Sequence, residues 1–184
     1  MGIKLEKYDK KYRKKLKNLY LTSFPAEERA PFFLMLHKTK KGRSDMIIAT
    51  ENGEFAGFVY MVCHLDMAYI FYLAIDESKR GKGLGGAVLE ALKSKYCGKR
   101  IFLAREQLDS CSKNYAQRVS RRNFYCRCGF EDMPCKIKEG AVVYDVMGIG
   151  GKITSGDYDQ LIKMWAGKML LKIVDMKLIE DQIS

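Results

Sequence analysis

The alternation of apolar and polar residues divides the chain into short strands and amphipathic helices. Apolar runs and strict alternation predict β-strands at 2–8, 46–51, 54–64, 68–76, 100–106, 131–138 and 141–147. Apolar residues three and four apart predict helices at 9–23, from 25 to about 38, from 84 onward and at 114–128. The expected buried side of the first helix consists of Tyr12, Leu16, Leu19 and Tyr20. This order of elements predicts an α+β fold.

Turn residues set the connections between several of these segments. Asn52-Gly53 supplies the positive φ angles of a type I′ turn, and it therefore predicts a hairpin between 46–51 and 54–64. Pro25 is expected to restart the chain as a second helix. Gly129 is expected to end the last predicted helix of the core, because glycine readily adopts the left-handed conformation that follows a helix.

The connections also predict how the strands pair. A helix joins 68–76 to 100–106, so we expect these two strands to be parallel. Hairpins join most of the others and make them antiparallel, and the pair 131–138 and 141–147 is expected to close the sheet as an edge hairpin. The prediction is a mixed, mostly antiparallel central sheet with flanking helices.

The segment between strand 68–76 and the following helix is rich in glycine and basic residues. It contains four glycines and two cations, which are Gly81, Gly83, Gly85, Gly86, Arg80 and Lys82. Glycines lack a Cβ, so backbone N–H groups beside them can approach an anion closely. The helix behind the loop adds unpaired amides and the positive end of its dipole. The pattern predicts a cradle for a pyrophosphate group.

Two other phosphate-binding patterns fit this loop less well. The P-loop pattern G-x-x-x-x-G-K-[ST] is absent, which argues against a nucleoside triphosphatase. Gly81-x-Gly83-x-x-Gly86 matches the dinucleotide fingerprint, and Glu106 lies 20 residues later, where a ribose-binding acid is expected. However, five residues, 76–80, separate the strand from the first glycine, and the chain is too short for two nucleotide-binding halves.

The spacing Arg80-x-x-Gly83-x-Gly85 resembles the coenzyme A pyrophosphate loop of the GNAT superfamily of N-acetyltransferases. A second block, Arg121-Arg122-Asn123-Phe124-Tyr125-Cys126-Arg127-Cys128-Gly129-Phe130, is similar to a segment that ends "F-Y-x-x-x-G-F" in that family. The gap between the two blocks suits one strand and one helix. The resemblance covers residues 45–148 well and implies the GNAT fold with acetyl-CoA as the cofactor.

The resemblance also assigns site residues. It implies that the cofactor is bound by Leu73, Ala74, Ile75, Arg80, Gly81, Lys82, Gly83, Leu84, Gly85 and Gly86. Tyr125 occupies the position of the family's general acid, and a phenol suits that task because its pKa of about 10 is near that of a thiolate. Helical spacing places Asn114, Arg118, Arg121 and Tyr125 in one polar stripe, which we expect to line the cofactor groove. A core aromatic among solvated arginines is the structural alternative.

The general base has no clear position in the sequence. Family members often carry a carboxylate on the strand before the loop, but 68–75 contains none. Glu106, at the end of the next strand, is one candidate for the base or for an anchor of the amine. Glu27 and Glu28, in a helix expected to border the acceptor site, are the others. Each of them could equally be a surface carboxylate, and a chain of water molecules could replace a dedicated base.

Charge and cysteine content add partner and compartment hypotheses. The net charge is +11, and eight Lys or Arg fall within the first 20 residues, which fits a solvated helix face or a contact with nucleic acid or the ribosome. The six cysteines have no zinc-ligand spacing, since Cys126-x-Cys128 is too close, so we expect no metal. No signal peptide is evident, and reduced thiols in a cytoplasmic protein are the simpler expectation.

The last thirty-odd residues lie outside the resemblance. We expect a GNAT core at 1–150 and a helical extension at 151–184. Charged residues such as Lys168 and Lys172 interrupt the apolar tail, so it is not a membrane span. A helix pair that packs on the core is the main expectation, and a homodimer contact or a lid over the acceptor site are the alternatives.

The predicted function is acetyl-CoA-dependent N-acetyl transfer to a primary amine, by direct transfer in a ternary complex. Acceptor pockets are built from variable segments, so both small-molecule and peptide amines remain open. Two alternatives belong to other classes. One is a coenzyme A-binding interaction module without transferase activity, and the other is a basic nucleic-acid-binding protein.

Overall fold

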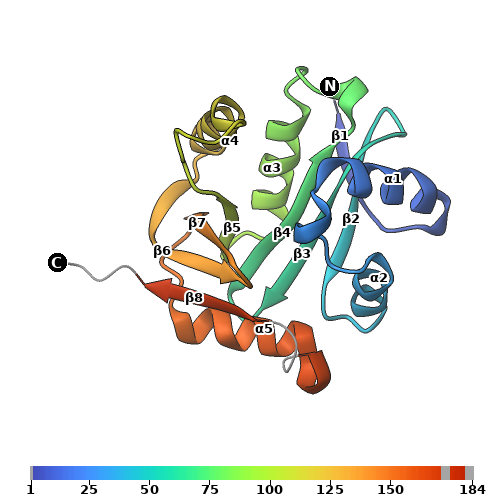
Figure 1. Cartoon of the computed structure of the whole chain (residues 1–184). Helices are drawn as coiled ribbons and strands as arrows, with labels where there is room; N and C mark the ends of the chain where they lie inside the picture. Colours follow the sequence, from blue (N-terminus) through green and yellow to red (C-terminus); the bar gives the residue numbers. More distant parts are fainter. Residues whose placement is uncertain (1, 171–174, 181–184) are drawn as a thin grey trace. The chain divides into compact units, whose positions relative to one another are not determined.

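The computed structural model of the chain describes residues 2–170 and 175–180. Its strands form a mixed, mostly antiparallel eight-stranded sheet in the order β1-β2-β3-β4-β5-β7-β6-β8 (Figure 1). The strands are β1 Ile3–Lys7, β2 Asp45–Glu51, β3 Glu54–His64, β4 Met67–Ile75, β5 Arg100–Glu106, β6 Glu131–Glu139, β7 Val142–Ile149 and β8 Met176–Glu180. The α-helices are α1 Arg13–Ser23, α2 Phe32–Lys40, α3 Leu84–Lys95, α4 Tyr115–Arg127 and α5 Ser155–Leu170. The predicted α+β class is confirmed.

The chain divides into two compact units. The N-terminal unit contains Met1–Cys63 and Ile70–Cys97, and the C-terminal unit contains His64–Tyr69 and Gly98–Ser184. The predicted boundary at residue 150 follows sequence resemblance rather than compactness, and it stays a proposal. Among the described helices, none has the length and apolar character needed to cross a membrane.

The N-terminal unit confirms the predicted hairpin. β2 and β3 pair antiparallel, and the turn between them has positive φ angles at Asn52 (51°) and Gly53 (81°). Gly57 in β3 lies very close to β4, because a Cβ built on it would be 2.4 Å from the carbonyl oxygen of Ala74. Glycine at this position therefore allows β3 to approach the end of β4.

Aromatic side chains fill the core of this unit. Tyr20 of α1 makes edge contacts with Phe58 of β3 and Tyr72 of β4, with ring centroids 6.2 and 5.1 Å apart. Phe24, just after α1, contacts Tyr72 with ring centroids 4.8 Å apart. Leu16, Leu19 and Tyr20 are buried as predicted, and the lysines of α1 lie on its exposed side. The basic face of α1 therefore has the form of a solvated helix face.

The second predicted helix is divided in the structure. A short 3₁₀ helix, η2 Ala26–Glu28, follows Pro25, and α2 begins only at Phe32, directly after Pro31. A proline ring disfavours helical conformation in the residue before it, so a continuous helix from 25 to 38 does not form. The prediction of one helix was wrong for this reason.

The C-terminal unit contains the antiparallel pairs β5–β7, β6–β7 and β6–β8. Its core includes Tyr69, stacked on Phe102 with ring centroids 4.7 Å apart, and the fully buried Tyr158 of α5. All six cysteines lie within the described residues, and none of them forms a disulfide.

The tail differs from the predicted helix pair. α5 provides one helix, interrupted at Gly167 with φ of 71°, but 176–180 forms β8, which pairs with β6 and contacts α5 (Figure 1). The hairpin β6–β7 is therefore not the edge of the sheet. The strand was missed because its five residues, Met-Lys-Leu-Ile-Glu, are too short to distinguish a strand from a helix by periodicity. The dimer and lid hypotheses for the tail stay predictions.

Arg100, at the start of β5, joins three parts of the C-terminal unit. Its guanidinium binds both carboxylate oxygens of Asp66 at 2.7 and 2.8 Å, and it donates to Asp157 of α5 at 2.7 Å. It also donates to the carbonyl of Lys152 at 2.7 Å. The hydrogen bonds from Arg100 hold the pKa values of Asp66 and Asp157 below their usual value. These bonds connect the turn before β4, β5 and α5.

Replacing Arg100 by glutamine should lower the melting temperature by roughly 5 °C at neutral pH, because charge-assisted hydrogen bonds to two carboxylates are lost. The two depressed pKa values mean that the unfolded chain binds protons first as the pH falls. The two carboxylates therefore stabilise the folded state at neutral pH. This stabilisation is lost as the pH falls from about 5 to below their pKa values in the folded protein. Thermal unfolding from pH 7 to pH 3 should show a shallower loss of stability in Arg100→Gln. The exposed Arg127→Gln serves as the control, and parallel profiles for wild type and Arg100→Gln would contradict the assignment.

Candidate functional site

In the N-terminal unit, β4 leads into the glycine-rich loop through a short, well-defined turn. Asp76 caps the 3₁₀ helix η3 Glu77–Lys79, since its carboxylate accepts from the amide and the hydroxyl of Ser78 at 3.1 and 2.6 Å. Lys79 forms an ion pair with Glu51 at 3.1 Å, so its charge is largely compensated. The exposed Arg80 donates from Nε to the carbonyl oxygen of Ile75 at 3.0 Å, with the rest of its guanidinium toward solvent.

The loop requires glycine because of its backbone conformation. Gly81 has φ of 77° and Gly83 has φ of 76°, a region that is unfavourable for residues with a Cβ. A Cβ built on either residue would meet no atom within 4 Å, so crowding plays no part. The loop is therefore bent by its glycines and is open at the surface.

The first turn of α3 is where the sequence predicts an anion site. Gly83 is the N-cap, and the first amide bonded back into the helix is that of Ala87, which donates to the carbonyl of Gly83 at 3.1 Å. The amides of Gly83, Leu84, Gly85 and Gly86 precede it and have no intrahelical acceptor. The first turn holds no acidic residue, and Lys82 is exposed beside it. Amides, helix dipole and cations thus favour an anion at the same point.

The end of β4 and the segment around η2 are tied together by tyrosine hydroxyls. Tyr72 donates to the carbonyl of Glu28 at 2.7 Å and accepts from the amide of Ala30 at 2.9 Å. Tyr20 donates to the carbonyl of Ala30 at 2.7 Å. Burial raises the pKa of the Tyr20 hydroxyl well above its usual value, so it remains a donor. Glu27, which is exposed, and Glu28 therefore lie on a segment that is fixed to β4 and α1.

In the C-terminal unit, Glu106 at the end of β5 is surrounded by polar groups of α4 and its N-cap. Its Oε1 accepts from Asn114 Nδ2 at 3.1 Å and lies 3.5 Å from Arg118 Nε, and its Oε2 lies 2.5 Å from Arg121 Nη1. Arg118 in turn donates to Asn114 Oδ1 and to the carbonyl of Gln107, both at 2.8 Å. Three members of the predicted stripe, Asn114, Arg118 and Arg121, thus bind Glu106, and its role in lining the cofactor groove stays a prediction.

A second carboxylate, Asp132 of β6, binds two further arginines. Arg122 of α4 donates to it through Nε at 2.9 Å, and the buried Arg105 of β5 donates at 2.9 Å. Arg105 also pairs with Asp145 of β7 at 3.0 Å. Burial alone would raise the pKa of Asp132, but hydrogen bonds from Arg122 and Arg105 outweigh it and hold this pKa below its usual value.

Tyr125 lies in the last turn of α4, where the chain turns into β6. Gly129, with φ of 84°, donates to the carbonyl of Cys126 at 2.9 Å, and Phe130 donates to the carbonyl of Tyr125 at 3.1 Å. This pair of bonds is a Schellman motif, and its usual apolar contact is present between the rings of Tyr125 and Phe130, 6.0 Å apart. Burial raises the pKa of Tyr125, and the cation of Arg121 opposes that effect.

The predicted site residues thus form two groups. The loop, the end of β4 and Glu27 and Glu28 lie in the N-terminal unit, while Glu106, the stripe of α4 and Tyr125 lie in the C-terminal unit. Sequence reasoning missed the ion pairs of Arg105 and Asp132. An arginine directly after the apolar run Ile-Phe-Leu-Ala, within a predicted strand, was the available signal, because a buried arginine requires carboxylate partners.

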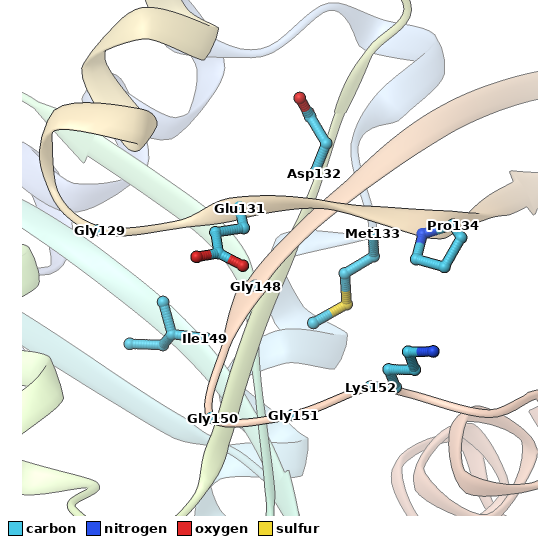
Figure 2. A pocket seen from close by; sticks show the side chains of 10 residues that line it. All are labelled: Gly129, Glu131, Asp132, Met133, Pro134, Gly148, Ile149, Gly150, Gly151 and Lys152. Atoms are coloured by element: carbon cyan, nitrogen blue, oxygen red, sulfur yellow. The ribbon is translucent and has the colours of Figure 1, made fainter.

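A separate depression of about 400 Å³ lies where β6 begins and β7 ends. Figure 2 shows Met133 beside Gly148, with Glu131 and Lys152 on different sides of the opening. A Cβ on Gly148 would fall 2.2 Å from the Cε atom of Met133, so the glycine makes room for this side chain. None of the predicted site residues lines this depression.

The sequence from residue 42 to residue 132 matches the model of the acetyltransferase (GNAT) domain family. A GNAT-family protein from Bacteroides thetaiotaomicron has a similar structure, with a TM-score of 0.68 at 20% identity, over 90% of this chain and 99% of that chain. Ard1 from Thermoplasma volcanium has a TM-score of 0.63 at 17% identity, over 81% and 97% of the two chains. An aminoglycoside 6′-N-acetyltransferase complexed with coenzyme A has a TM-score of 0.60 at 14% identity, over 82% and 99%. No curated protein matches the chain.

The turn after α4 provides a test of how Tyr125 is held. Gly129→Ala should cost about 1 kcal/mol and lower the melting temperature by roughly 2–4 °C, because alanine is strained at positive φ. Gly129→Asn should cost less, since asparagine tolerates this conformation better. Thermal unfolding of the two variants beside wild type measures the difference. Equal stability of Gly129→Ala and wild type would contradict the Schellman assignment.

Proposed function

Because this chain belongs to the GNAT superfamily of acetyltransferases, we propose that it transfers an acetyl group from acetyl-CoA to a primary amine by direct attack. The observation that carries the proposal is the open, glycine-bent loop at the N-terminus of α3, with unpaired amides, two exposed cations and no acid in the first turn. Such a site favours a pyrophosphate, which coenzyme A contains.

The reaction requires three tasks of the protein, which are to hold the acetyl carbonyl, to give a proton to the sulfur and to take a proton from the amine. As the amine nitrogen bonds to the acetyl carbon, charge develops on the carbonyl oxygen, the carbon–sulfur bond breaks and the sulfur takes up a proton. The amine loses one proton, so the balance closes. We assign the first task, holding the acetyl carbonyl, to the backbone amides of Leu73–Ile75, because fixed dipoles stabilise developing charge without reorganising.

We assign the proton for the sulfur to Tyr125. A phenol must be protonated before it can donate, and burial raises the pKa of Tyr125, which keeps it protonated at neutral pH. Its position at the end of α4 is fixed by the Schellman motif and by the contact with Phe130. A hydroxyl held in one place is what general acid catalysis requires.

We assign the acceptor side to the segment around η2, with Glu27 and Glu28 as candidates to attract the amine and take its proton. The support is that Tyr72 and Tyr20 fix this segment through its backbone, and that Glu27 on it is exposed. A carboxylate near the acceptor would favour a cationic amine by Coulomb attraction. The basic face of α1 is not needed for the reaction, and a contact there with nucleic acid stays a prediction.

Substituting Gly83 by aspartate should weaken acetyl-CoA binding by tenfold to roughly hundredfold, because a side chain and a negative charge enter the anion site. Gly42→Asp is a matched control, since Gly42 also has a positive φ (66°) and open space around it but lies between α2 and β2. Calorimetric titration with acetyl-CoA measures both. Wild-type affinity in Gly83→Asp would place the cofactor elsewhere.

Replacing Tyr125 by phenylalanine should reduce kcat by roughly hundredfold and leave the Kd for acetyl-CoA nearly unchanged, because only the hydroxyl is lost. Turnover is measured against a panel of small-molecule and peptide amines. An unchanged kcat would make Tyr125 a structural residue. Acetyl-CoA binding by the wild type without transfer to any amine would instead favour a coenzyme A-binding interaction module.

A further inference from the structure

The helix α4 is attached to its unit in an unusual way. No side chain of α4 is fully buried, although Tyr125 is partly covered, and the helix connects the end of β5 to the start of β6 (Figure 1). Helices usually pack through an apolar face that becomes buried. Its arginines instead meet two carboxylates of the sheet, Glu106 and Asp132. The placement of α4 therefore depends on charged contacts more than on apolar burial.

Glu106 holds the first part of the helix. Its two carboxylate oxygens are divided between the N-cap Asn114 on one side and Arg121 on the other, and Arg118 lies 3.5 Å from Oε1. The Glu106 side chain is only 18% exposed, which strengthens these contacts relative to a surface pair. One anion thus spans two turns of α4.

The same contacts argue against a role for Glu106 in binding or deprotonating an amine. Two arginine cations stand within 3.5 Å of one carboxylate, so the local charge is positive and would repel a cationic amine. Both oxygens already accept hydrogen bonds, and taking a proton would require that one of these bonds breaks. The geometry fits a structural task at the site better than a chemical one.

We propose that Glu106 is a positioning residue that holds α4 through Asn114, Arg118 and Arg121 and thereby sets the position of Tyr125. Arg121 lies one turn before Tyr125 on the same face of the helix, so a fixed Arg121 restrains the part of α4 that carries the tyrosine. The inference rests on the proposed function, because it assumes that Tyr125 donates the proton.

Asp132 makes the inference testable without loss of the fold. It holds Arg122 and the buried Arg105 independently of Glu106. The Schellman motif fixes the end of the helix by backbone bonds. Removing the charge of Glu106 should therefore loosen the first turns of α4 while the unit stays folded.

The experiment is a double-mutant cycle between Glu106→Gln and Tyr125→Phe. Glu106→Gln alone should lower kcat by tenfold to roughly hundredfold with an unchanged Kd for acetyl-CoA, because the proton donor is misplaced. In the Tyr125→Phe background the same substitution should cause no further loss, since the group that it positions is already absent. Glu131→Gln, at an exposed position in β6, is the control and should match wild type. A full additional loss in the Tyr125→Phe background would overturn the proposal and favour Glu106 as the base.

A second measurement does not depend on activity. Hydrogen exchange of the amides in 115–127 should be faster in Glu106→Gln than in wild type and in Glu131→Gln. Unchanged exchange would overturn the proposal, even if kcat falls. Should the wild type acetylate no amine, the proposed function would fail on that result, whereas the exchange of α4 would still decide whether Glu106 holds the helix.

Discussion

The arginines of α4 that face the sheet bind carboxylates of the neighbouring strands, and this charge pairing shapes the C-terminal unit. Glu106 ends β5 and Asp132 is the second residue of β6, so the two strands that flank α4 in sequence each supply one anion to its arginines. Asp132 is shared with Arg105, a buried arginine that also pairs with Asp145. Breaking such a pair leaves a buried charge without compensation, which is strongly destabilising. The strand ends and α4 are therefore coupled by charge.

The two units differ in the groups that compensate charge. In the N-terminal unit, the candidate anion site consists of backbone amides that glycines expose, and side-chain charge is secondary. In the C-terminal unit, the charged side chains satisfy one another, and Arg118 and Asn114 are engaged with Glu106 and with each other. We infer that these two residues contribute to the cofactor site mainly by shaping α4. The exposed Arg80 and Lys82 remain better suited to meet a phosphate.

Local sequence signals predicted the elements that depend on local conformation. Asn52-Gly53 and Gly129 marked a hairpin and a helix end because their positive φ values are properties of single residues. The break at Pro31 was equally local and was overlooked. The strand β8 and the partners of Glu106 depend on contacts between distant segments, since β8 pairs with β6 about 40 residues earlier. The five residues of β8 are too few for periodicity to identify a strand. The periodicity of α4 likewise does not identify the carboxylates that its arginines bind.

Tyr125 is restrained both by bonds within its own segment and by a contact with a strand that is distant in sequence. The Schellman motif and Phe130 restrain it from the end of the helix, where Gly129 in the sequence already predicted a helix end. Arg121 restrains it from the preceding turn, because Arg121 binds the carboxylate of Glu106, which reaches α4 only when β5 is folded. The same arginine opposes the effect of burial on the pKa of the phenol. Because Glu106 compensates the charge of Arg121, it also limits how far that cation can favour the phenolate, and a phenol that stays protonated is the form that can donate a proton.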